Sequence, residues 1–179
     1  MIDTIKVAVA VFVLAVFQVS ATPQITPSTT GPDLVVILVI SLALLRGPVW
    51  GASAGFVGGI MLDSLDAQSL GLTSLLYVLV AIWASERAPK VEVAGVERPA
   101  TPTLGRHLVI VIVGAVFVQL GLAVVQSLIG DGYGLSIAFW RVVLPCSIET
   151  AAFALPLVPL MRWLFPTTTR IDVPTAATA

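Results

Sequence analysis

The stretch that decides the fold runs from Arg46 to Trp83 and reads RGPVWGASAGFVGGIMLDSLDAQSLGLTSLLYVLVAIW. A glycine-rich apolar segment comes first and ends at an acidic residue, Asp63. A short polar turn follows, and Gly71 then opens a second apolar segment. Two apolar segments joined by a polar turn predict a hairpin of two helices, around which we expect the rest of the chain to be organised.

Small residues recur along the first helix of this hairpin. Gly51, Gly55 and Gly59 lie four residues apart, and Gly58 stands beside the last of them. On a helix such positions drift by only about 40° per step, so one side stays small. Because two backbones can approach closely along a side of this kind, we expect these glycines to form a helix-packing face.

The composition is that of an integral membrane protein. The chain has 179 residues, of which 58% are hydrophobic and 11% charged, whereas about 25% of a soluble domain is charged. The net charge of −1 provides no basic field for nucleic acid. Cys146 is the single cysteine, so neither an internal disulfide nor a cysteine-histidine metal site is expected, and no cofactor is implied.

Apolar runs separated by polar or proline-rich segments predict an all-α bundle of six transmembrane helices. The runs are Ile5 to Ala21, Leu34 to Leu45, Val49 to Leu62, Leu70 to Trp83, Leu108 to Ile129 and Val142 to Leu160. Loops are expected at Thr22–Asp33 and Glu86–His107. We expect one domain over residues 1–165 and a flexible cytoplasmic tail over 166–179.

One alternative topology merges Leu34 to Leu62 into a single long helix, which gives five spans. Charge placement favours six. With six spans and both termini cytoplasmic, eight of the nine basic residues lie inside and only Arg141 lies outside. Those eight are Lys6, Arg46, Arg87, Lys90, Arg98, Arg106, Arg162 and Arg170. The topology puts Asp63 at the outer face and Arg46 at the inner face.

A possible serine nucleophile lies within the glycine-rich segment. Gly51-Ala-Ser53-Ala-Gly55 matches the G-x-S-x-G pattern of hydrolases, and His107 is the only histidine. That pattern requires a strand before the serine and a helix after it, whereas here it stands inside an apolar helical run. We therefore favour a packing role, with Ser53 bonded to its own helix.

Acidic and amide side chains are the remaining candidates for chemistry. With six spans, Asp63, Asp66, Asp131 and Glu149 all fall in the outer half of the membrane or in outer loops, where paired carboxylates could support aspartyl proteolysis. Within the spans, polar groups are expected to hydrogen-bond between helices or to line a small-ligand pocket. These are Gln18, Gln119, Gln126 and Glu149.

The opening stretch resembles the MreD family of rod shape-determining proteins. The resemblance rests on Arg46-Gly47, on the spaced glycines, on Leu62-Asp63 and on Leu70-Gly71. It covers Arg46 to about Trp83 at the level of the motif and nearly the whole chain in architecture. Arg46, Asp63 and Gly71 are then the polar and turn positions of the signature.

The resemblance implies a non-enzymatic scaffold of cell-wall elongation, which maintains rod shape in the bacterial plasma membrane. Its partners would be an MreC-type single-span protein and, indirectly, MreB, RodZ and the RodA–penicillin-binding synthase pair. The family fold is similar to the substrate-binding subunits of energy-coupling-factor (ECF-type) transporters. A vitamin-binding subunit is therefore the alternative function.

Overall fold

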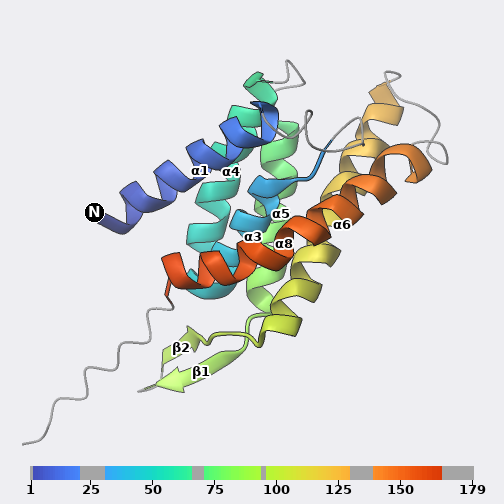
Figure 1. Ribbon diagram of the computed structural model, residues 1–179. Helices are drawn as coiled ribbons and strands as arrows, with labels where there is room; N and C mark the ends of the chain where they lie inside the picture. The colour runs from blue at the N-terminus through green and yellow to red at the C-terminus, as the bar shows by residue number, and fades with distance from the viewer. Residues whose placement is uncertain (1, 21–30, 66–70, 94–95, 130–138, 167–179) are drawn as a thin grey trace, which may run out of the picture.

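The computed structural model is predominantly helical and describes residues 2–20, 31–65, 71–93, 96–129 and 139–166 (Figure 1). A one-turn π-helix at Phe139–Val143 leads into the last helix. The long helices are α1 (Ile2–Ser20), α3 (Leu34–Arg46), α4 (Pro48–Leu65), α5 (Leu72–Glu86), α6 (Leu104–Ile129) and α8 (Leu144–Leu164). Strands β1 (Lys90–Val93) and β2 (Val96–Pro99) form an antiparallel hairpin between α5 and α6.

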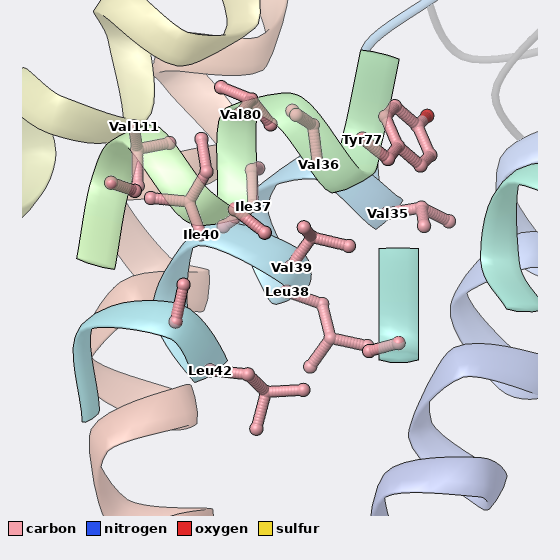
Figure 2. Close-up of a cluster of buried hydrophobic side chains, with 14 of the residues drawn as sticks. Val35, Val36, Ile37, Leu38, Val39, Ile40, Leu42, Tyr77, Val80 and Val111 are labelled. Atoms are coloured by element: carbon pink, nitrogen blue, oxygen red, sulfur yellow. The ribbon is translucent and has the colours of Figure 1, made fainter. Parts of the chain in front are cut away.

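The centre of the bundle is α3. Every residue from Leu34 to Leu45 is buried, and the helix packs against α1, α4, α5, α6 and α8. Figure 2 shows the surrounding side chains, with Tyr77 and Val80 of α5 and Val111 of α6 beside those of α3. The expectation that the Arg46–Trp83 hairpin occupies the centre is therefore wrong. An apolar sequence on all sides allows α3 to be buried on all sides but does not require it, because the apolar helix α6 remains partly exposed.

Neighbouring helices alternate in direction. Ala43 of α3 lies against Gly51 of α4, and Val35 lies against Gly58, so the two helices are antiparallel. Between them Gly47 has φ +97°, a left-handed conformation that glycine adopts without strain. The chain therefore turns back at Gly47, and Leu34 to Leu62 forms two helices rather than one.

The same alternation continues around the bundle. Asp3 of α1 pairs with Arg46 at one end of α3, and Gln18 bonds to Leu34 at the other end. The first residues of α1, α4 and α6 thus lie at the same end as the last residues of α3 and α5. We call this the hairpin end, because β1 and β2 lie there (Figure 1).

Three of the described helices are long and apolar enough to cross a membrane: Asp3–Ser20, Leu104–Leu128 and Trp140–Leu164. The helices α3 and α5 are shorter and apolar. Large apolar side chains stand on the outside of the bundle, among them Phe12, Phe56, Phe117 and Trp163. These features agree with the prediction of a helical membrane protein.

The segment from Glu86 to His107 differs from the expected loop. It contains the last residue of α5, the β-hairpin and the first turn of α6. His107 is fully buried within α6. Its ring nitrogen Nε2 lies 3.0 Å from Ser41 Oγ of α3, whereas its Nδ1 is buried without a hydrogen-bond partner among the described residues.

Candidate functional site

The four glycines of α4 face two neighbours. A Cβ atom at Gly51 would lie 2.6 Å from the Cβ of Ala43, and one at Gly58 would lie 2.8 Å from Val35 Cγ1, both on α3. Gly55 and Gly59 instead lie against the backbone of α5. The drift of a four-residue repeat explains this division, because it rotates successive positions away from a single face. The glycines therefore let α4 pack closely against both α3 and α5, and they do not form one continuous face.

Asp63 joins the ends of α4 and α5. It lies in the last turn of α4, not in the turn that follows, and it is 2% exposed. Its Oδ2 accepts a hydrogen bond of 2.7 Å from the backbone N–H of Gly71, the residue that caps the start of α5. Gly71 has φ +96°, which favours glycine. Two residues of the family-like motif thus form one contact.

A second bond ties the same two helices together. The Ser74 hydroxyl donates to the carbonyl oxygen of Phe56 at 3.1 Å. Ser74 is also the residue against which Gly59 packs. One short part of the α4–α5 interface therefore contains three contacts, made by Gly59, by the Ser74 hydroxyl and by the Asp63 carboxylate.

A buried polar cluster that was not predicted from the sequence lies at the start of α3. Asp33 is 4% exposed, and its Oδ1 accepts hydrogen bonds from the Tyr77 hydroxyl at 2.6 Å and from the Val36 N–H at 3.1 Å. The Asp33 N–H donates to Thr150 Oγ1 of α8 at 2.9 Å. Asp33 was expected at the end of a loop; here it is the N-cap of the central helix.

Gln18 of α1 completes this cluster. Its Oε1 accepts hydrogen bonds from the N–H groups of Leu34 at 2.8 Å and Val35 at 3.1 Å. Together with Asp33 it satisfies the first three N–H groups of α3, which a buried helix start would otherwise leave without partners. We call Gln18, Asp33, Tyr77 and Thr150 the α3 cap cluster. It joins α1, α3, α5 and α8.

The other intramembrane polar residues predicted from the sequence lie elsewhere. Gln119 of α6 is buried, and Gln126 of the same helix is half-buried. Glu149 of α8 is half-buried and precedes Thr150 of the α3 cap cluster. Of the four polar residues that were predicted within the spans, Gln18 is the one that belongs to the α3 cap cluster.

Ser53 and His107 do not form a catalytic pair. Ser53 is exposed on α4, and its hydroxyl donates to the Trp50 carbonyl of the same helix at 3.1 Å. His107 bonds to Ser41 instead. Because α4 is helical on both sides of Ser53, the strand-turn-helix context of a nucleophile elbow is also missing there.

Two described carboxylates likewise bond to groups other than a second carboxylate. Asp63 bonds to a backbone N–H, and Asp33 bonds to Tyr77. Asp66 and Asp131 lie outside the described residues. Within the described part of the chain, histidine, cysteine, aspartate and glutamate form no group of three that could hold a metal ion.

An apolar groove of about 600 Å³ runs along the outer side of the α4–α5 hairpin. Phe56 and Leu75 stand at its sides, 55% and 58% exposed. The remaining lining consists of Ile60, Gly71, Ser74 and Val78. The groove thus borders the Asp63–Gly71 contact.

Comparison with models of protein families, with curated proteins and with solved structures finds no match to this chain.

Proposed function

We propose that this chain is a six-span membrane scaffold of the MreD type, which acts in cell-wall elongation in the bacterial plasma membrane. The observation that carries the proposal is the Asp63–Gly71 hydrogen bond beside an open apolar groove. It gives the family-like motif a physical role: the glycines and the aspartate hold two helices together in a fixed hairpin. The outer side of that hairpin then offers a surface of constant shape.

Six spans are supported by helix direction and by charge. The described helices alternate in direction, and the ends of α3, α5 and α8 at the hairpin end carry Arg46, Arg87 and Arg162. Arg106 begins α6 at the same end. A cytoplasmic hairpin end follows from the excess of basic residues on the inner side of bacterial membrane proteins.

The short central helix does not conflict with six spans. With 13 residues, α3 is about 20 Å long, less than the ~30 Å of a hydrocarbon core. Its residues Leu34 to Leu45 are buried by other helices, so its ends meet protein rather than lipid. The polar groups at its start are bonded within the α3 cap cluster.

The groove is the surface that we assign to an MreC-type single-span partner. An apolar helix fits an apolar groove between two helices, and packing there requires no ionic contact. The small residues Gly71 and Ser74 form part of its lining, so a partner helix can approach the backbone of α5. No proton or ion chemistry is needed for this role.

The α3 cap cluster favours a scaffold over a vitamin-binding subunit. A binding subunit needs polar groups that are available to its ligand. Here Gln18, Asp33, Tyr77 and Thr150 are bonded to each other or to the first N–H groups of α3. They stabilise the bundle and leave the start of α3 capped.

Co-purification tests the proposal. The chain would be co-expressed with a single-span protein that has a periplasmic coiled coil and is encoded by a neighbouring gene. Leu75→Trp fills the groove, and Leu155→Trp adds the same bulk to the exposed face of α8, away from α4 and α5. We expect Leu75→Trp to reduce capture by about tenfold or more and Leu155→Trp to leave it unchanged.

Two results would count against the scaffold. Failure of the wild-type chain to capture the partner would remove its central expectation. A vitamin retained in equal stoichiometry through purification, seen by mass spectrometry, would favour the transporter subunit instead. Equal loss of capture in both tryptophan variants would reject the groove as the docking surface.

A further inference from the structure

Two arginines meet where α5 ends and α6 begins, at the hairpin end of the bundle. Arg106 donates a hydrogen bond of 2.8 Å from its Nη2 to the backbone carbonyl of Arg87. Both side chains are exposed. The Arg106 guanidinium therefore contacts the backbone of Arg87, so both arginines lie at one exposed junction of α5 and α6.

The Arg87 side chain is held in place by its own helix. Its guanidinium carbon lies 4.0 Å from the centre of the Trp83 ring, and its Nη1 donates to the Trp83 carbonyl at 3.1 Å. A guanidinium stacked on an aromatic ring keeps its charge and most of its donors. Tryptophan is also the side chain typical of headgroup depth in a membrane.

Among the side chains that the structure describes, which leave out those of residues 91–99, no carboxylate forms an ion pair with either arginine. Glu86, next in the chain to Arg87, is exposed and forms no ion pair with it. The one ion pair between described side chains joins Arg46 to Asp3, on another side of the bundle. The α5–α6 junction therefore carries two exposed guanidinium groups without an ion-pair partner among the described side chains.

Exposed apolar side chains follow this pair of arginines along the lengths of α5 and α6, away from the hairpin end. On α5, Leu79 and Trp83 precede Arg87 at successive four-residue steps, which keeps all three on one face. On α6, Val109 and Val113 follow Arg106 at three and seven residues, again on one face. Leu79, Val109 and Val113 are all substantially exposed, at 45%, 59% and 46%.

We infer that the α5–α6 junction binds an anionic phospholipid from the cytoplasmic leaflet. The phosphate lies between Arg87 and Arg106, which are suited to bidentate hydrogen bonds with phosphate oxygens. The acyl chains lie along the two apolar faces. Charge complementarity selects this occupant over a partner helix, because an apolar helix would leave both arginines without an anion.

Lipid retention tests the inference on the purified full-length chain. In neutral detergent, phosphatidylglycerol and phosphatidylcholine would be added separately, and bound lipid would be measured by native mass spectrometry. We expect wild type to retain phosphatidylglycerol in preference to phosphatidylcholine. Arg87→Gln with Arg106→Gln should weaken phosphatidylglycerol binding by about tenfold or more.

Matched variants separate the site from a general effect of charge. Arg141→Gln removes a single exposed arginine outside the junction and should still prefer phosphatidylglycerol to phosphatidylcholine. The double variant Arg87→Lys with Arg106→Lys keeps both positive charges and should show the same preference. If the double glutamine variant does not fold, Arg87→Gln alone should still reduce binding.

Equal retention of the two lipids by wild type, or undiminished binding in the glutamine variants, would overturn the inference. Thermal stabilisation by inorganic phosphate equal to that by phosphatidylglycerol would also overturn it, because the site would then recognise a free anion.

Discussion

The carboxylate of Asp63 accepts a hydrogen bond from the backbone N–H of Gly71 at 2.7 Å, across the turn between α4 and α5. Removing that acceptor takes away the Asp63 partner of a part-buried N–H, whereas the isosteric amide keeps an oxygen in place. We expect Asp63→Ala to lower the free energy of unfolding by about 1–2 kcal/mol and Asp63→Asn to lower it by less. Thermal unfolding in detergent measures both.

The control for Asp63 is its neighbour Ser64, which is exposed and bonds to Ile60 within its own helix. Ser64→Ala should change stability by less than about 0.5 kcal/mol. Equal losses for Asp63→Ala and Ser64→Ala would show that the bond to Gly71 contributes little.

The close approach of α4 to α5 predicts that Gly59 tolerates no side chain. A methyl group there would overlap the backbone N and Cα atoms of Ser74, which cannot move without separating the helices. We expect Gly59→Ala to cost about 1–3 kcal/mol and to reduce the yield of monodisperse protein. Gly105→Ala is the matched control, because nothing lies within 4 Å of its new methyl group. A stable Gly59→Ala protein would contradict the packing described for α4.

The α3 cap cluster predicts a stabilising role for the Tyr77 hydroxyl. Tyr77→Phe removes the donor to Asp33 and leaves the aromatic ring in place. We expect it to lower the free energy of unfolding by about 1–2 kcal/mol, since a buried carboxyl loses one of its partners. Ser85→Ala on the same helix removes an exposed hydroxyl and should have little effect. If Tyr77→Phe is as stable as wild type, the hydrogen bond from Tyr77 to Asp33 does not help to stabilise α3 in the bundle.

Ser53 should be dispensable. Its hydroxyl is exposed and bonds only to its own helix among the described residues. Ser53→Ala should therefore change the free energy of unfolding by less than about 0.5 kcal/mol. It should also leave partner capture unchanged. Labelling of wild type, but not of Ser53→Ala, by a serine-directed fluorophosphonate would revive the hydrolase hypothesis.

The topology makes a prediction for the β-hairpin. Pro99 ends β2 at the hairpin end of the bundle, which basic residues place on the cytoplasmic side under the six-span proposal. A reporter fused after Pro99 should be active when it requires the cytoplasm and inactive when it requires export. The reverse result would invalidate six spans with both termini inside.

The helical segments were predictable because their signals are local. Gly47-Pro48 interrupts an apolar run, and glycine and proline end helices through their own backbone geometry. The β-hairpin was not predicted, since Lys90 to Pro99 is charged and flanked by prolines, and such composition is typical of a loop. His107 was assigned to that loop for the same reason, and its burial depends on Ser41, which is 66 residues away.

The α3 cap cluster was only partly within reach of the sequence. Asp33 stands directly before an apolar run, which is the position of an N-cap, and that signal was available. Its partners were not, because Tyr77 is 44 residues away and Thr150 is 117 residues away. Likewise, a stretch of apolar residues does not reveal its depth in a bundle, so Leu34 to Leu45 gave no sign that α3 lies at the centre.

The length of α3 has a consequence for membrane insertion during synthesis. A segment of 13 residues is shorter than the ~17–25 residues that insert on their own, and α4 and α5, which bury it, are made after it. Under the six-span proposal, we therefore expect α3 to enter the membrane stably only once the Gly47 turn has brought α4 alongside it. Insertion of the first three segments would then be cooperative, and the glycines of α4 would act during biogenesis as well as in the finished bundle.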